Sequence, residues 1–216
     1  NLVSVRVIRK IGARYAQDYI QRFGFESEKH PPYLTMALGA GSVTPLQLAT
    51  GYGVFANGGY RVEPYLISKV LDAKGNVLFE ATPQKSGDSQ LKVLDSRTAF
   101  VMDSLLQEVT KTGTAASARP ALGRSDIAGK TGTTNESMDA WFAGYHPNIV
   151  AVAWIGFDKP KSLGDRETGG GLALPMWTRY MKTALSGIPE SPRTAPPGVS
   201  QQDGDWVIPE FVPFLD

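Results

Sequence analysis

The sequence predicts an α+β chain, in which amphipathic helices are combined with antiparallel β-hairpins. Two hairpin patterns, each a strand, a short turn and a second strand, lie at 66–80 and 139–157. Strands joined by so short a turn pair antiparallel. Apolar residues recur at helical spacing in four other segments, namely 3–23, 44–57, the segment from Asp95 to Gly113, and 175–185.

Capping signals set the limits of the first two helical segments. The first is interrupted at Gly12 and ends at Gly24, because glycine is favoured where a helix stops. Thr44 is expected to cap the second, with Pro45 in the first helical position and Gln47 completing a capping box.

The other two helices are expected to bury one apolar side each. Asp95 or Ser96 caps the third segment, and Pro175 opens the fourth. The predicted buried positions are Met102, Leu105, Leu106 and Val109 on the third, and Trp177, Tyr180, Met181, Ala184 and Leu185 on the fourth.

Two parts of the chain are expected, 1–187 as a folded unit and 188–216 as a tail. The tail is rich in proline and predicted to be irregular. Trp206, Ile208 and Phe211 suggest that part of it docks on another surface.

Composition excludes several classes of function. Of 216 residues, 22 are Lys or Arg and 21 are Asp or Glu, which gives a net charge of +1 without a long run of one sign. Nucleic acid and acidic membranes are therefore not expected partners. There is no cysteine and there are only two histidines, His30 and His146, so a metal site or a Ser-His-Asp triad is poorly supplied. No apolar run is long enough to span a bilayer.

Two copies of Lys-Thr-Gly-Thr stand out as candidate motifs, at 111–114 and 130–133. Lys-Thr-Gly is one of three motifs of penicillin-interacting serine enzymes. The first copy follows a predicted helix, where a cation and a glycine are favoured for capping alone. The second lies on a predicted strand. A nucleotide-binding P-loop is a poor alternative there, because five residues rather than four separate Gly123 from Gly129.

On a strand, Thr131 and Thr133 share one face, and Lys130 points to the other. Two hydroxyls about 7 Å apart can hold a carboxylate, and Lys130 adds positive potential. Gly132 lets another group approach closely, and a backbone N–H beside it can donate to an oxyanion. The simpler interpretation is an edge strand with a glycine bulge and surface threonines.

Several blocks resemble the transpeptidase domain of class A penicillin-binding proteins. They are GKTGTTN at 129–135, DAWFAGY at 139–145, ALGAGSVTPL at 37–46, FANGGY at 55–60 and, more loosely, GGLALPMW at 170–177. The resemblance implies an α/β (α+β), serine β-lactamase/transpeptidase-like fold, with a mainly antiparallel sheet flanked by helices and incomplete at its N-terminus. It also implies acyl transfer from D-Ala-D-Ala stem peptides of peptidoglycan, and acylation of the same serine by β-lactam antibiotics.

The resemblance also assigns roles. Lys130 would serve the proton-transfer network and the substrate carboxylate, Thr131 and Thr133 would bind that carboxylate, and the Thr133 N–H would complete the oxyanion hole. Gly132 would make room for the helix of the acylated serine. Asn1 would be the last residue of a Ser-x-Asn element, hydrogen-bonded to the substrate. No metal and no cofactor is implied.

The nucleophilic serine of that family is missing from this sequence. Ser-x-x-Lys occurs as Ser89 to Lys92, but in a polar loop and after Asn1 rather than before it. The chain also begins at Asn1 without a methionine, which suggests an excised segment whose missing N-terminal part supplies the serine. The 216 residues alone are then expected to be inactive. A catalytically inactive penicillin-recognising or cell-wall-binding domain is the alternative, and a scaffold with a fortuitous Lys-Thr-Gly is a third.

The resemblance also implies a cellular location for the parent protein. The parent protein would act at the extracytoplasmic (periplasmic) face of the cytoplasmic membrane, anchored by a segment absent here. It would carry an upstream glycosyltransferase domain. Neither membrane nor nucleic acid is expected to contact these residues.

Overall fold

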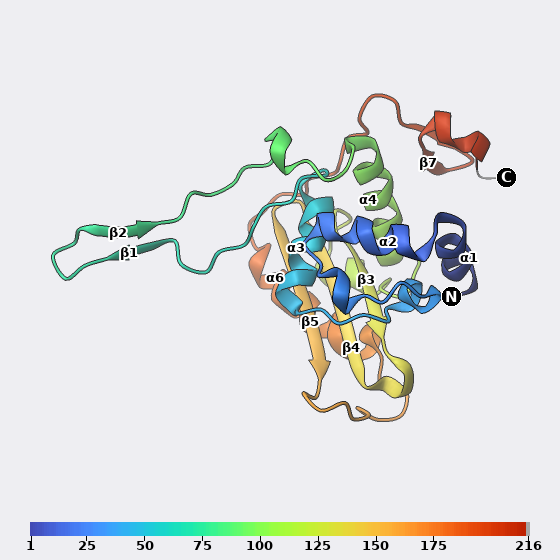
Figure 1. Cartoon of the computed structure of the whole chain (residues 1–216), viewed down its shortest axis with the longest axis horizontal. Helices are drawn as coiled ribbons and strands as arrows, with labels where there is room; N and C mark the ends of the chain where they lie inside the picture. Colours follow the sequence, from blue (N-terminus) through green and yellow to red (C-terminus); the bar gives the residue numbers. More distant parts are fainter. Residues whose placement is uncertain (215–216) are drawn as a thin grey trace.

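A computed structural model of the chain describes residues 1–214. At its centre is an antiparallel sheet of three strands in the order β3–β4–β5. Helix α3 packs on one face of this sheet and α6 on the other, while α4 lies against β3 (Figure 1). The elements of this central unit are α3 (Pro45–Ala56), α4 (Ser96–Lys111), β3 (Ala128–Thr133), β4 (Asp139–His146), β5 (Ile149–Gly156) and α6 (Leu174–Ala184). The predicted α+β class is confirmed.

Shorter elements surround this unit. Four are regular helices or the two strands of a projecting hairpin: α1 (Leu2–Ile11), α2 (Ala13–Ile20), β1 (Lys69–Leu71) and β2 (Val77–Glu80). Others complete the turns and the C-terminal part: η1 (Gln21–Phe23), η2 (Ser27–Lys29), η3 (Leu34–Leu38), η4 (Ser89–Leu91), α5 (Ala118–Leu122), η5 (Asn135–Ser137), η6 (Gly169–Ala173), β6 (Ser200–Gln202), β7 (Asp205–Val207) and η7 (Pro209–Phe214).

The helix boundaries follow the predicted capping residues. The Thr44 hydroxyl accepts the Gln47 N–H, and the Gln47 side chain accepts the Thr44 N–H, so the capping box at α3 is formed. Asp95 caps α4 by accepting the Arg97 N–H. Gly12 separates α1 from α2 with a φ of 90°, a conformation that glycine adopts without strain.

Side chains along β4 point alternately to the two faces of the sheet, and a separate hydrophobic core lies on each face. Phe142 on β4 is fully buried, faces α6 and stacks edge-on against Trp177 with ring centroids 4.8 Å apart. Tyr145, three residues further, lies on the opposite face against α3 and α4. The turn between β4 and β5 consists of Pro147 and Asn148, within the hairpin predicted at 139–157. Two opposed faces of one hairpin therefore hold the helical layers in place.

The buried side of α4 differs from the prediction. Leu105 is 55% exposed, whereas Asp103 and Thr110 are buried. These polar groups are satisfied, because the Tyr145 hydroxyl donates to Asp103 Oδ1 over 2.8 Å and Thr110 donates to the Ile127 carbonyl over 2.9 Å. The face of α4 that meets the sheet is thus partly polar, which an apolar pattern does not reveal. On α6, Tyr180 is likewise exposed rather than buried.

The C-terminal part is more ordered than predicted. Residues 200–207 form the β6–β7 hairpin instead of irregular chain. Trp206 docks on Phe100 of α4, with ring centroids 5.0 Å apart, whereas Phe211 is exposed. Arg193 reaches inward, and its Nε lies 3.0 Å from Asp103 Oδ1. The division at residues 187 and 188 stays a prediction.

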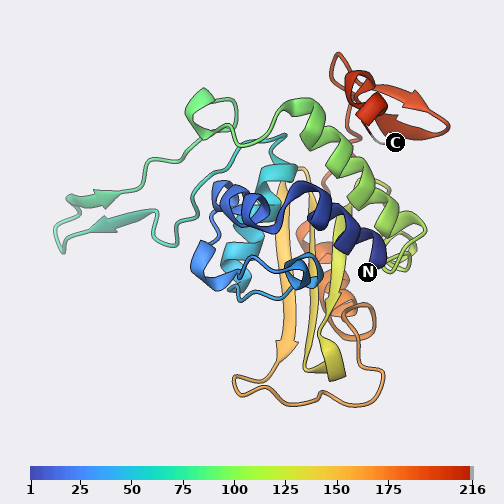
Figure 2. The ribbon, with the colours of Figure 1, turned by 45° about the vertical axis from the view of Figure 1, so that its right-hand side comes forward.

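The hairpin of β1 and β2 projects away from the central unit (Figures 1 and 2). Asp72 closes its turn by accepting the N–H groups of Lys74 and Asn76. Both faces of the two strands are exposed. Among residues 1–214, no helix has the length and apolar character needed to cross a membrane.

A buried polar cluster fixes the start of β3 to the C-terminal part. Arg124 forms two hydrogen bonds with the carboxylate of Asp126, and Asp126 also accepts the Ser191 N–H. His146 is fully buried beside them, with Nε2 3.1 Å from Asp126 Oδ2. His146 Nδ1 accepts the Asn148 N–H, so the ring carries no proton there. Nε2 lies 3.1 Å from both Asp126 Oδ2, which can accept its proton, and Arg124 Nη2. The imidazole is therefore held in its neutral form.

This cluster predicts that stability falls in mild acid. Burial lowers the pKa of His146, against the opposing effect of Asp126 and with the help of the charge of Arg124. The unfolded chain then binds a proton near pH 6.5 that the folded chain does not. The stabilising effect is complete above that pH and is lost as pH falls through it. We expect the melting temperature to drop between pH 7.5 and 5.5, and the drop to be smaller in His146→Gln. An equal drop in both proteins would contradict this assignment.

Candidate active site

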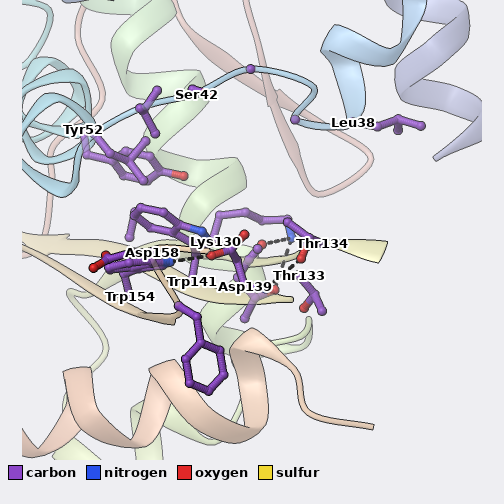
Figure 3. A pocket seen from close by; sticks show the side chains of 18 residues that line it. Leu38, Ser42, Tyr52, Lys130, Thr133, Thr134, Asp139, Trp141, Trp154 and Asp158 are labelled. Atoms are coloured by element: carbon purple, nitrogen blue, oxygen red, sulfur yellow. Dashed lines mark hydrogen bonds between the residues drawn. The ribbon is translucent and has the colours of Figure 1, made fainter. Parts of the chain in front are cut away.

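A cleft of about 720 Å³ lies between the sheet and the segment that precedes α3. In Figure 3, Lys130, Trp141 and Asp139 lie on the sheet below the segment that carries Leu38 and Ser42. The lining residues are Leu38, Gly39, Gly41, Ser42, Val43, Leu48, Tyr52, Lys130, Thr131, Gly132, Thr133, Thr134, Asp139, Trp141, Ala143, Trp154, Phe157 and Asp158. The second Lys-Thr-Gly-Thr copy thus forms one wall of this cleft.

Lys130 lies on β3, whose other side has no strand partner among the described residues. Its amine turns back along the strand and donates to the Thr131 carbonyl over 2.9 Å, and it lies 3.3 Å from Thr131 Oγ1. Lys130 and Thr131 are consecutive residues of β3 and so start from opposite faces of the strand. The Lys130 amine nevertheless bends back to the Thr131 hydroxyl, so the two groups are not separated as predicted. Loss of hydration in the cleft lowers the pKa of Lys130.

The hydroxyls of Thr131 and Thr133 each meet a polar group from a different segment. Thr131 Oγ1 lies 2.6 Å from Thr114 Oγ1, in the turn that follows α4. Thr133 Oγ1 accepts the backbone N–H of Gly169 over 3.1 Å, at the start of η6. Since a hydroxyl has one proton and two lone pairs, the Thr133 proton remains available to a ligand. The wall therefore offers hydroxyl donors beside an ammonium group, which suits a carboxylate.

Glycines allow the close packing behind this wall. A Cβ on Gly169 would lie 2.3 Å from the Trp141 carbonyl and 2.4 Å from the Gly132 carbonyl, so only glycine fits there. A Cβ on Gly132 would press on Trp141 Cβ at 3.2 Å, and both residues line the cleft. The absence of a side chain at Gly132 therefore leaves room beside Trp141 in the cleft.

Aromatic and acidic side chains line the cleft beside the Lys-Thr-Gly-Thr wall. Trp141 and Trp154 pack with centroids 5.7 Å apart, and Trp154 Nε1 donates to Asp139 Oδ1 over 2.8 Å. Tyr52 of α3 lines the opposite side, and burial raises its pKa to about 12. Tyr52 is therefore a neutral phenol at physiological pH and can act there only as a hydrogen-bonding group.

Two sequence candidates lie outside the cleft. Asn1 is an exposed residue at the N-cap of α1 and is not among the lining residues. Ser89 begins η4 on the exposed loop, where Asp88 caps that turn. Its position supports the interpretation of Ser89 as a loop serine. Ser42 does line the cleft, on the extended segment before α3.

The structure also bears on the P-loop alternative and on the first Lys-Thr-Gly-Thr copy. Strand β3 continues to Thr133 and no helix begins at Lys130, which excludes a P-loop. The first copy does end α4, with Thr112 at the C-cap, as predicted. Sequence reasoning missed, however, that Thr114 of this first copy lies against Thr131 of the second. It also missed the Gly169 N–H. In residues 1–214, no three His, Asp or Glu side chains gather where they could bind a metal ion.

Comparison with known proteins bears on the same residues. The model of the penicillin-binding protein transpeptidase domain matches residues 1–181, a range that includes the whole cleft wall. The chain belongs to this family. Penicillin-binding protein 1A of Neisseria flavescens is 48% identical over 97% of the chain, and the match covers 26% of that protein. The chain thus spans about a quarter of the length of such relatives.

Solved structures of this transpeptidase family agree with the fold. The crystal structure of penicillin-binding protein 1A from Haemophilus influenzae matches with a TM-score of 0.87 and 33% identity, over 96% of this chain and 38% of that one. PonA1 of Mycobacterium tuberculosis in complex with penicillin V matches with a TM-score of 0.71 and 25% identity, over 95% and 58%. The chain is a transpeptidase portion of class A type.

Proposed function

We propose that this chain provides the carboxylate-binding half of a serine D,D-transpeptidase site. The longer protein that contains it would join peptidoglycan stem peptides by acyl transfer from D-Ala-D-Ala, and β-lactam antibiotics would acylate the same serine. The observation that carries the proposal is the wall of β3, where Lys130, Thr131 and Thr133 present an ammonium group and two hydroxyls along one cleft.

The geometry supports a role for each residue. Thr131 and Thr133 bind the terminal carboxylate of the stem peptide, because their hydroxyls can donate to an anion. Lys130 compensates the charge of that carboxylate, and its lowered pKa suits a group that exchanges protons during acyl transfer. Gly132 admits the reacting carbonyl, and the Thr133 N–H donates to the oxyanion.

The nucleophile and the side chain of a Ser-x-Asn element belong to other parts of the proposed site. The Ser42 N–H donates to the Lys29 carbonyl over 3.1 Å. Among the described residues, no lysine or histidine side chain is hydrogen-bonded to the Ser42 hydroxyl, so it lacks the base that would activate it. We therefore assign the nucleophile to residues outside these 216. Asn1 completes the Ser-x-Asn element once the preceding residues are present.

Labelling with a fluorescent penicillin tests this proposal. The longer protein is expected to be covalently labelled, whereas the isolated 216-residue chain is not, and boiling in detergent should not release the label. Mass spectrometry should locate the label on a serine outside residues 1–216.

The same experiment separates the alternatives. Reversible binding of penicillin by the longer protein without a covalent adduct would favour a catalytically inactive recognition domain. Labelling of the isolated chain would contradict the assignment of the nucleophile. For the intact enzyme we propose a place on the periplasmic side of the cytoplasmic membrane, where its peptidoglycan substrate lies.

A further inference from the structure

The threonine of the first Lys-Thr-Gly-Thr copy is part of the cleft wall. Thr114 is exposed, and its Oγ1 lies 2.6 Å from Thr131 Oγ1. Its backbone is held firmly, because the neighbouring Ala115 is fully buried and donates its N–H to the Val109 carbonyl over 3.1 Å. Gly113 closes against the end of α4, where a Cβ would meet the Val109 backbone at 2.8 Å. The Thr114 hydroxyl is therefore placed by α4 and not by chance surface contact.

The hydrogen bond between the Thr114 and Thr131 hydroxyls can run in either direction, and the two directions leave different protons free. Lys130 can only donate, so Thr131 Oγ1 accepts from its amine. The remaining lone pair and the single proton of Thr131 are shared between Thr114 and any ligand. If Thr131 donates to Thr114, the Thr131 proton is not available to a carboxylate. If Thr114 donates to Thr131, the Thr131 proton is free to point into the cleft.

We propose that Thr114 is a positioning residue for the substrate carboxylate, because its hydroxyl donates to Thr131 and turns the Thr131 proton toward the ligand. Thr133 is oriented in a parallel way by the N–H of Gly169. Each of the two threonine hydroxyls on β3 is thus oriented by a hydrogen-bond donor from another segment. This inference rests on the proposed transpeptidase function and adds to it a residue outside the Lys-Thr-Gly strand.

Substitutions in the longer protein test the donor role. Thr114→Val keeps the shape of the side chain and removes the hydroxyl, and Thr114→Ser restores it. Thr112→Val is the matched control, because Thr112 lies two residues away and donates instead to Glu108 over 2.7 Å. For each protein, the rate of acylation is measured with benzylpenicillin and with its methyl ester, which lacks the carboxylate. Melting temperatures are recorded beside the rates.

Loss of one neutral hydrogen bond predicts that Thr114→Val slows acylation by benzylpenicillin about tenfold. The rate with the methyl ester should stay at the wild-type value, since there is no carboxylate to orient. Thr114→Ser should recover most of the rate, and Thr112→Val should not differ from wild type. Thr131→Ala combined with Thr114→Val should be no slower than Thr131→Ala alone, because Thr114 acts through Thr131.

Other outcomes overturn the inference in distinguishable ways. Wild-type rates in Thr114→Val show that the hydroxyl has no role, and the proposed function then stands. An equal slowing with penicillin and ester shows that the substitution merely disturbs the wall. If Thr114→Val does not fold, Thr114→Ala takes its place. The inference is then overturned if Thr114→Ala slows acylation by benzylpenicillin no more than acylation by the methyl ester. A wild-type protein that penicillin does not acylate removes the proposed function and this inference together.

Discussion

Replacement of Lys130 by methionine is expected to slow acylation of the longer protein by penicillin at least about a hundredfold, the lower end of what a proton-transfer group contributes. Methionine keeps the length of the side chain and removes both the charge and the three donors. The amine that now contacts Thr131 would be lost, and the carboxylate would face an uncharged wall. The second-order rate of labelling by fluorescent penicillin measures this effect.

The chain supplies a matched control for that substitution. Lys111 is the lysine of the first Lys-Thr-Gly-Thr copy and forms an exposed ion pair with Glu108. Lys111→Met should label at the wild-type rate, since exposed pairs contribute little. The affinity of wild-type protein for a penicillin should also fall as pH rises through the lowered pKa of Lys130, because the ammonium is then lost. Comparable rates in Lys130→Met and Lys111→Met would contradict the role given to Lys130.

Gly169→Ala is expected to damage both the wall and the fold around it. The new Cβ would collide with the carbonyls of Gly132 and Trp141, at 2.4 and 2.3 Å, and these are backbone atoms of β3 and β4 that cannot turn aside. The start of η6 must then move away from β3, which breaks the hydrogen bond from Gly169 N–H to Thr133. Overpacking of this kind costs about 1–3 kcal/mol of stability. We also expect slower acylation by penicillin.

Gly171→Ala, two residues along in the same turn, is the control. Its Cβ would meet only the Thr168 hydroxyl at 3.4 Å, an ordinary contact. Denaturant unfolding should therefore separate the two variants, with the midpoint lowered in Gly169→Ala and nearly unchanged in Gly171→Ala. Equal midpoints would show that η6 is not pressed against β3 as described.

Local chemistry made most of the elements predictable. The box of Thr44 and Gln47, the cap at Asp95 and the turn at Pro147 are decided by residues within a few positions of one another. The same holds for the antiparallel hairpin of β4 and β5, which is predicted from two apolar runs joined by a short turn. In these places the sequence pattern and the structure agree.

The parts that sequence reasoning missed depend on distant segments. Thr114 and Thr131 are 17 residues apart, and Gly169 and Thr133 are 36 apart. Neither contact leaves a periodic signal in the chain. The buried Asp103 on α4 was missed for the same reason, because its partners Tyr145 and Arg193 come from β4 and the C-terminal part.

The family motif identified β3 as the wall of a site, and the structure adds the segments that orient its hydroxyls. One strand carries the ammonium and both threonines, while the turn after α4 and the start of η6 each supply a partner. We therefore propose that three segments of the chain, rather than one tripeptide, take part in recognising a carboxylate. The nucleophile is assigned to a fourth, outside these residues.

A crystal structure of the longer protein acylated by a penicillin tests this assignment most directly. We expect the penicillin carboxylate to lie within hydrogen-bond distance of the Thr131 and Thr133 hydroxyls, with the acyl bond to a serine outside residues 1–216. A carboxylate bound elsewhere, or an acyl bond to Ser42 or Ser89, would contradict it.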